Sequence, residues 1–389
     1  MKSFMVSKKP QILFGENTSA QVGSKFRELG CKKVFVVCDP VLRKMGLFEH
    51  VFTSLKEAEV QAIIFDEVTT DPPVELVDRA ARQAVDEQVD GILGLGGGSC
   101  MDVAKGVNNL LHNEFPIKDY LWPNAKSVVP GSSAPLILIP TTSGTGSEVS
   151  DAAVFYDAEL NMKRGTKNEA NLASLSIVDP VFGRSMPRAL TGQSGLDTMT
   201  HAIECMTTET RNLMSSTLAA RSLELVWENL PRALDNGDDL DARAYLSFAG
   251  MAAAMGFTDA GTHVGHLTAH QIGAKFHIPH GECCAMVAPA LLVFLEDKLP
   301  AEIRMIAKAV GVDPASAAPG RDAAEAVKSL ARKAGLRSAT ACGIRKEDLL
   351  ALAPEIYNSV KNQWSAPAEI KNAGEAGCVE ILTMIAEAE

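Results

Sequence analysis

Apolar residues in the first half of the chain follow two alternating patterns. Short apolar runs rich in branched side chains recur at residues 34–38, 61–65, 91–95 and 136–139. Between them lie segments with a helical spacing of apolar residues, as at 74–88. Continuous apolar strands separated by helices are typical of a parallel sheet that is covered on both faces. The first half of the chain is therefore predicted to be an α/β domain.

The pattern changes in the second half, where strand-like runs almost disappear. Long stretches rich in Ala, Leu, Met and Glu take over, for example at residues 215–229, 241–255 and 301–310. Such stretches predict an all-helical domain. A chain of 389 residues is also longer than a single hydrophobic core usually supports. We therefore expect two domains, residues 1–185 and residues 186–389.

Composition and charge indicate which classes of partner and which cellular compartment to expect. The net charge of −11 argues against binding a phosphate backbone, which needs a basic face. The apolar runs are too short to cross a bilayer, and Met1 to Pro10 lacks the apolar core of a secretion signal. Eight cysteines without a C-x-x-C pair are typical of reduced thiols. We expect a cytoplasmic protein with neither nucleic acid nor membrane as a partner.

Two loops after predicted strands have the composition of phosphate-binding turns. Gly94 to Ser99 is rich in glycine and leads into a helical pattern, where bare backbone amides can bind phosphate. By itself this cluster is equally compatible with a plain turn, and it is not the standard Rossmann fingerprint. The second loop, Pro140 to Glu148, is dense in Thr, Ser and Gly, which suit phosphate and amide recognition.

Asp39 lies at the end of the first predicted strand and is followed by a proline. An acidic residue there can accept hydrogen bonds from an adenosine ribose, and its charge would repel a 2′-phosphate. This placement favours NAD(H) over NADP(H). The alternative is that Asp39 only forms a turn before Pro40.

The second half contains a concentration of potential metal ligands. Asp197 and His201 are four residues apart, as are His266 and His270, and His280 follows in a Pro-His-Gly segment. Residues four apart share one face of a helix. One carboxylate and three imidazoles can bind Fe(II), Zn(II), Co(II) or Mn(II). Spacing alone leaves open whether these side chains converge.

Together these motifs resemble the iron-containing (group III) alcohol dehydrogenases, relatives of glycerol dehydrogenase and dehydroquinate synthase. The resemblance covers almost the whole chain and is weakest after residue 310. It implies a dehydroquinate synthase-like fold, with an α/β dinucleotide-binding domain followed by a helical domain. The matching motifs, in the family's order, are Gly96 to Ser99 with Asp102, Pro140 to Glu148, Lys163, Asp197 with His201, His266 with His270, and Pro279 to Gly281.

The resemblance also implies a role for each matching residue. The implied metal ligands are Asp197, His201, His266 and His280. His270 corresponds to a position near the substrate that relays a proton. The implied contacts to the cofactor are Asp39, Gly97, Gly98, Ser99, Asp102, Thr141, Thr142, Thr145 and Lys163. The implied cofactors are NAD(H) and one divalent metal, Fe(II) in the first place and Zn(II) or another first-row metal as alternatives.

The implied function is hydride transfer between NAD(H) and a small alcohol or aldehyde, with the metal polarising the substrate oxygen. The resemblance further implies a homodimer or a higher homo-oligomer. The chain departs from the family's sequence at two places that bear on the cofactor and the substrate. Asp71-Pro72-Pro73 stands where relatives often have Asn-Pro-Thr, and Lys361-Asn362-Gln363 replaces an acidic stretch. The second departure favours a polar or anionic aldehyde, either sulfonated or carboxylated, unless Lys361 simply faces solvent.

Two other functions stay open at this stage. A lyase related to dehydroquinate synthase would use the same metal and NAD. It is disfavoured because residues 195–210 and 248–274 carry no lysine to hold a phosphorylated acid. The other alternative is a non-catalytic protein that binds nucleotide or metal.

Overall fold

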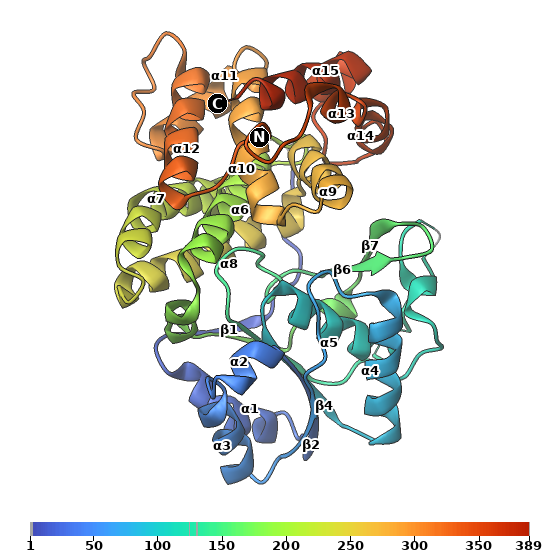
Figure 1. The fold of residues 1–389 in the computed structure, drawn as a ribbon. Helices are drawn as coiled ribbons and strands as arrows, with labels where there is room; N and C mark the ends of the chain where they lie inside the picture. Colours follow the sequence, from blue (N-terminus) through green and yellow to red (C-terminus); the bar gives the residue numbers. More distant parts are fainter. Residues whose placement is uncertain (1–2, 124, 130, 389) are drawn as a thin grey trace. The chain divides into compact units, whose positions relative to one another are not determined.

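The computed structural model describes residues 3–123, 125–129 and 131–388 (Figure 1). The chain divides into two compact units. The first, called the sheet unit here, comprises Lys8–Thr142 and Gly146–Ser185. The second, called the helical unit, comprises Met186–Glu389 together with Met1–Ser7 and Ser143–Thr145.

The sheet unit is built on a six-stranded sheet with the order β1-β8-β5-β4-β2-β3, in which all pairs are parallel. The strands are β1 (Gln11–Phe14), β2 (Lys33–Cys38), β3 (Gln61–Phe65), β4 (Gly91–Gly96), β5 (Leu136–Pro140) and β8 (Leu175–Val178). The four strands β2 to β5 match the apolar runs of the sequence. The strands β1 and β8, of four residues each, were not among the predicted strands.

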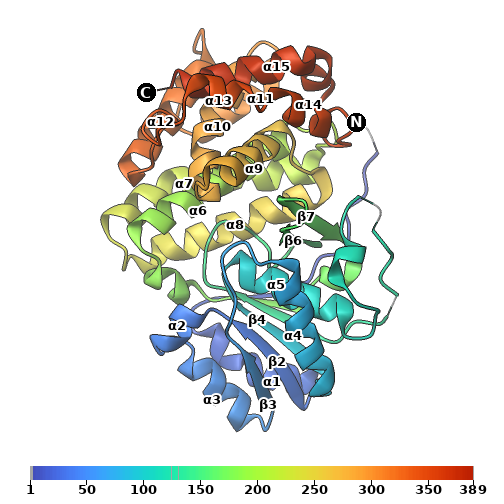
Figure 2. The ribbon, with the colours of Figure 1, turned by 45° about the vertical axis from the view of Figure 1, so that its right-hand side comes forward.

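Helices cover both faces of this sheet, as the continuous apolar strands predict. Phe35 and Val37 of β2 belong to one buried core, and Val34 and Val36 belong to the other. The first core includes residues of α4 (Val74–Asp86) and α5 (Gly98–Leu110), and the second includes residues of α1 (Val22–Glu28) and α3 (Glu49–Glu57). Figures 1 and 2 show these two helix pairs on opposite sides of the strands.

An antiparallel pair of strands, β6 (Ala152–Asp157) and β7 (Met162–Lys167), completes the sheet unit. The apolar pattern did not predict it, because β7 is a largely polar strand with the sequence MKRGTK. The remaining short elements are η1 (Thr18–Gln21), α2 (Pro40–Lys44), η2 (Ile117–Tyr120), η3 (Glu169–Asn171) and η4 (Pro180–Ser185).

The helical unit packs its helices around one continuous core. Its helices are α6 (Arg188–Thr207), α7 (Leu213–Asp235), α8 (Leu240–Ala260), α9 (Val264–Phe276), α10 (His280–Leu295), α11 (Pro300–Ala309), α12 (Pro319–Ala334), α13 (Lys346–Leu350), α14 (Ala353–Val360) and α15 (Ala368–Ala386). The predicted fold class is confirmed. Within the described residues, every helix is too short or too polar to cross a membrane.

Two helices of this unit, α6 and α10, are buried along most of their length. A helix that is buried all round is normally apolar on every side. Nevertheless α6 carries Asp197, His201 and Glu204 in its interior-facing turns. Buried polar groups need partners to offset their lost hydration, so each of these three side chains requires a polar partner inside the helical unit.

Candidate metal centre

Four side chains from three helices converge inside the helical unit. They are Asp197 from α6, His266 from α9, and His280 and Cys284 from α10, and their ligand atoms all lie within 4.8 Å of one another. The Oδ1 atom of Asp197 lies 3.5 Å from His266 Nε2, 3.4 Å from His280 Nε2 and 3.5 Å from Cys284 Sγ. Ligand atoms about 2.1 Å from a shared tetrahedral ion are separated by about 3.4 Å. The spacing therefore suits a common metal ion.

His201, the fourth predicted ligand, lies beside this group. Its Nδ1 atom is 3.7 Å from Asp197 Oδ1, and its ring stacks on that of His266 with centroids 4.2 Å apart. Phe257 covers the ring as well, at 4.5 Å. Burial lowers the pKa of His201 to about 3, which keeps the imidazole neutral and its lone pair available. The structure thus places His201 next to Asp197 but outside the tightest four-group cluster.

The buried nitrogens of this cluster are incompletely bonded. Within the described part of the chain, His201 Nδ1 and His266 Nε2 have no hydrogen-bond partner. Burial alone would raise the pKa of Asp197, yet the imidazoles of His201 and His280 hold it well below its usual range. A buried carboxylate surrounded by unpartnered imidazole nitrogens is the arrangement that a metal cation would complete. The donor set and its geometry therefore fit a divalent metal.

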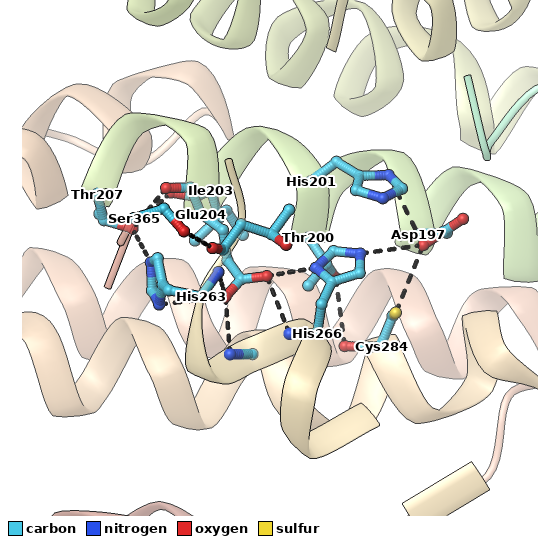
Figure 3. A network of polar contacts seen from close by, with 12 residues as sticks. Asp197, Thr200, His201, Ile203, Glu204, Thr207, His263, His266, Cys284 and Ser365 are labelled. Atoms are coloured by element: carbon cyan, nitrogen blue, oxygen red, sulfur yellow. Dashed lines mark hydrogen bonds and ion pairs between the residues drawn. The ribbon is translucent and has the colours of Figure 1, made fainter. Parts of the chain in front are cut away.

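Glu204 supports the cluster from the side of His266 that faces away from Asp197 (Figure 3). It is completely buried and accepts hydrogen bonds from the backbone N–H groups of His263, Gly265 and His266 at 2.9, 2.7 and 3.0 Å. These groups lie at the N-terminus of α9, where N–H groups are free and negative charge is favoured. A Cβ atom on Gly265 would lie 2.8 Å from the Glu204 carboxyl carbon, so a glycine permits this approach.

The same carboxylate also contacts two imidazoles. His266 Nδ1 makes a short hydrogen bond to Glu204 Oε2, and His263 Nδ1 lies 3.1 Å from Oε1. Burial would raise the pKa of Glu204, but His263 and His266 lower it to about 2. Because Glu204 holds Nδ1 of His266, Nε2 is the ring nitrogen that faces Asp197. Metal-binding histidines commonly have such a carboxylate partner.

His270 lies on the accessible side of the cluster. It follows His266 by one turn of α9, and its ring centroid is 5.0 Å from that of His280. His270 is partly exposed, and the side chain of His280 is 30% exposed. These two histidines are therefore the parts of the site that are accessible to solvent.

Cys284 and Glu204 were missed by reasoning from the sequence. Both carry a local signal, since Cys284 follows His280 by four residues and Glu204 follows His201 by three. Such spacings place side chains on one helix face, but they also occur by chance in any helix.

In the sheet unit, the glycine loop lies at the carboxyl end of β4. Gly97 caps α5, and Gly96 has a φ of +156°. Asp39 and Thr141 follow the neighbouring strands β2 and β5, with Asp39 N–H bonded to Leu95 O and Thr141 N–H to Gly96 O at 3.1 and 3.0 Å. The structure therefore brings Asp39, the glycine loop and Thr141 together where parallel sheets bind nucleotides.

Two further observations concern this edge of the sheet. The Thr142 hydroxyl is buried and has no hydrogen-bond partner among the described residues, and it lies close to Gly97. The Asp39 carboxylate caps α2 by accepting from the N–H groups of Val41 and Leu42 through Oδ1. Asp39 thus forms the turn before α2, as the alternative interpretation of its role predicts. Both of its hydrogen bonds use the same carboxylate oxygen, Oδ1.

The other five predicted cofactor contacts have different surroundings. Asp102 accepts from the Ser147 hydroxyl at 2.7 Å and from Val154 N–H at 3.0 Å. Lys163 on β7 forms an ion pair with Asp71 at 2.7 Å. Thr145 belongs to the helical unit with Ser143 and Gly144, whereas Thr141 and Thr142 belong to the sheet unit. Gly98 and Ser99 are the first two residues of α5.

Lys361, which motivated the anionic-substrate hypothesis, is exposed after the end of α14. Its ammonium group donates to Asn358 Oδ1 at 2.6 Å. Gln363 donates to Thr262 O at 2.9 Å. The contacts of Lys361 are those of a lysine that faces solvent.

Two protein-family models match the chain. The model described as iron-containing alcohol dehydrogenase matches residues 9–180. The model described as the C-terminal part of the Fe-containing alcohol dehydrogenase family matches residues 191–383.

Individual proteins are similar to this chain over most of their length. A choline dehydrogenase of Bacillus subtilis (strain 168) is 32% identical over 80% of this chain and 78% of its own. An NAD-dependent methanol dehydrogenase of Bacillus methanolicus is 29% identical over 91% of this chain and 93% of its own. The solved structure of a 1,3-propanediol oxidoreductase has a TM-score of 0.91 and 28% identity, covering 99% of this chain and 100% of the other.

Proposed function

Because the chain belongs to the iron-containing alcohol dehydrogenase family, we propose that it transfers hydride between NAD(H) and a small alcohol or aldehyde at the cluster around Asp197. The predicted family and the predicted class of enzyme, an oxidoreductase that uses NAD(H) and a metal, are confirmed.

The proposed metal ligands are Asp197, His266 and His280, with His201 beside them. The observation that carries this assignment is the convergence of three helices on one point, with ligand atoms within 4.8 Å and unpartnered buried nitrogens. When bound, the metal supplies Lewis acidity at the substrate oxygen.

The residues of the chain provide orientation and proton transfer. Glu204 holds the His266 ring in one tautomer and one direction. We propose that His270, which is partly exposed and adjacent to His280, moves the hydroxyl proton between the site and solvent. The amides of Gly97 and Gly98 and the Thr142 hydroxyl are proposed to bind the cofactor phosphates, and the negative charge of Asp39 is proposed to favour NAD(H).

The lyase alternative stays disfavoured, because residues 195–210 and 248–274 carry no lysine to hold a phosphorylated acid. For the substrate we propose a short alcohol or aldehyde without a required charge, because Lys361 is exposed and bonded to Asn358.

The test is a metal-resolved assay of turnover. Chelator-stripped protein is reloaded with Fe(II), Zn(II), Co(II) or Mn(II), and NADH oxidation is followed with neutral and anionic short aldehydes. We expect turnover with at least one metal, its loss in His266→Ala and comparable rates for neutral and anionic substrates. The matched control is His277→Asn, an exposed histidine after α9 whose positive φ of 56° asparagine tolerates.

Tight NADH binding without turnover under any metal would reject the proposed dehydrogenase activity and favour the non-catalytic alternative. A strong preference for anionic aldehydes would reject the neutral-substrate part of the proposal alone.

A further inference from the structure

Cys284 occupies a position in the metal cluster that the predicted ligand set does not include. It follows His280 by one turn of α10 and is completely buried. Its sulfur lies 3.5 Å from Asp197 Oδ1 and 3.6 Å from His280 Nε2. These separations are close to the 3.5 and 3.4 Å between the histidine nitrogens and Asp197, so the sulfur belongs to the same group of converging ligand atoms.

The neighbouring Cys283 shows that the position of Cys284 is specific. Consecutive residues of a helix point about 100° apart, so only one of the two thiols can face the cluster. The Cys283 sulfur instead lies 3.7 Å from the carbonyl oxygen of Ile278. Of the cysteines in the described part of the chain, Cys284 is the one that belongs to the four-group cluster.

The unpartnered nitrogens give a second, independent observation. His266 Nε2 is directed at the same Asp197 oxygen as the Cys284 sulfur, and it lacks a hydrogen-bond partner in the described chain. The nearby His201 Nδ1 lacks one as well, and both side chains are more than nine-tenths buried. A cation among these atoms would give both nitrogens a partner at once.

We infer that Cys284 binds the metal as a thiolate, next to Asp197, His266 and His280; this inference rests on the proposed metal site. Forming the metal–sulfur bond breaks the S–H bond, and the proton leaves to solvent. A thiolate is a soft ligand, so it favours Zn(II), Co(II) and Fe(II) over Mn(II) and Mg(II). Cys284 therefore strengthens the preference of this cluster for these metals over Mn(II) and Mg(II).

The test uses Co(II) alone as the probe, added to the metal-free full-length protein. A thiolate-to-cobalt charge-transfer band in the near ultraviolet should grow and saturate at one Co(II) per chain. The band should be absent in Cys284→Ser and unchanged in the matched control Cys283→Ser. The affinity of Cys284→Ser for Zn(II) should fall at least about tenfold, the lower end of what loss of a ligand's supporting partner costs.

Saturation by one Co(II) without the band would overturn the role of Cys284 and leave the proposed dehydrogenase site intact. Failure of Co(II) to bind at all would overturn both. Should Cys284→Ser not fold, X-ray absorption of the zinc-loaded wild-type protein decides. We expect one sulfur scatterer at about 2.3 Å, and a shell of nitrogen and oxygen alone would refute the inference.

Discussion

Asp197 shows how single residues shape this site. Its Oδ1 atom faces two imidazoles and a thiol within 3.5 Å, inside a helix that is otherwise largely buried. The direction of each imidazole matters as much as its presence, because only one ring nitrogen can face a metal. For His266 that direction is set by Glu204, which bonds the other ring nitrogen and the backbone beneath it.

Glu204→Gln is therefore expected to weaken metal binding without removing a ligand. The amide keeps the shape of the side chain but loses the charge that holds the His266 Nδ1 proton. Affinity for Zn(II) should fall about 10–100-fold, the usual effect of losing a carboxylate behind a metal-binding histidine. Competition with a chromogenic chelator measures it.

The control for this substitution is Glu228→Gln, an exposed glutamate on the neighbouring helix α7. It should bind zinc like the wild-type protein. Unchanged zinc affinity in a folded Glu204→Gln variant would show that His266 is oriented by packing alone.

At the scale of elements, the connection from β4 to α5 positions the second part of the proposed site. Gly96 and Gly97 differ in what a side chain would meet. A Cβ on Gly96 would lie 2.6 Å from the Cys100 sulfur, in a backbone conformation with φ of +156°. A Cβ on Gly97 would meet only Thr142, at an ordinary contact distance of 3.5 Å, with φ of −73°.

Gly97→Ala is thus expected to fold normally and to bind NADH poorly, because the methyl group would stand where a phosphate approaches the helix N-terminus. We expect the Kd for NADH to rise about tenfold or more, equivalent to about 1.4 kcal/mol. Fluorescence titration measures the Kd, and thermal unfolding checks the fold.

Gly96→Ala serves as the comparison, since it should lower the thermal stability as well as the affinity. Wild-type NADH affinity in Gly97→Ala would exclude the glycine loop as the phosphate site.

The strands also show which elements the apolar pattern of the sequence predicts and which it does not. The strands β2, β4 and β5 were predicted because both of their faces are buried and their apolar runs are continuous. The strand β7 was not, because Met162–Lys167 has the polar sequence of a loop and pairs only with β6. Asp102 was assigned to the cofactor, yet both of its oxygens accept hydrogen bonds from Ser147 and Val154, contacts that depend on the tertiary fold.

At the scale of the whole molecule, the metal cluster links segments that are far apart in the chain. Asp197 lies on α6, His266 on α9, and His280 with Cys284 on α10. A metal that binds these groups only when the helices are packed stabilises the native state by mass action. Within the helical unit it would act as a cross-link between three helices.

Metal removal should consequently lower the melting temperature. A metal at 100 times its Kd adds about 2.7 kcal/mol to native-state stability. For a unit of this size, each kcal/mol corresponds to a shift of about 2–4 °C. Calorimetry with chelator and with saturating Zn(II) measures the shift. In His266→Ala the shift should largely vanish, and an equal shift in that variant would place the stabilising metal elsewhere.

The sequence by itself determined the family, the fold class and the type of reaction. The fold class follows from strand and helix periodicity, whereas the family and the type of reaction follow from the resemblance of the glycine loop and the ligand pairs to the motifs of a known family. Each of these sequence features lies within one short segment of the chain. The order of the motifs along the chain then identifies the family that combines them.

Only the tertiary structure decided which side chains share the site. His201 is a predicted ligand and Cys284 is not, yet packing places the Cys284 sulfur inside the four-group cluster and His201 beside it. Glu204 likewise becomes important only because the N-terminus of α9 lies against α6. These outcomes depend on how three helices pack, and helix packing is encoded by contacts between distant residues rather than by any local pattern.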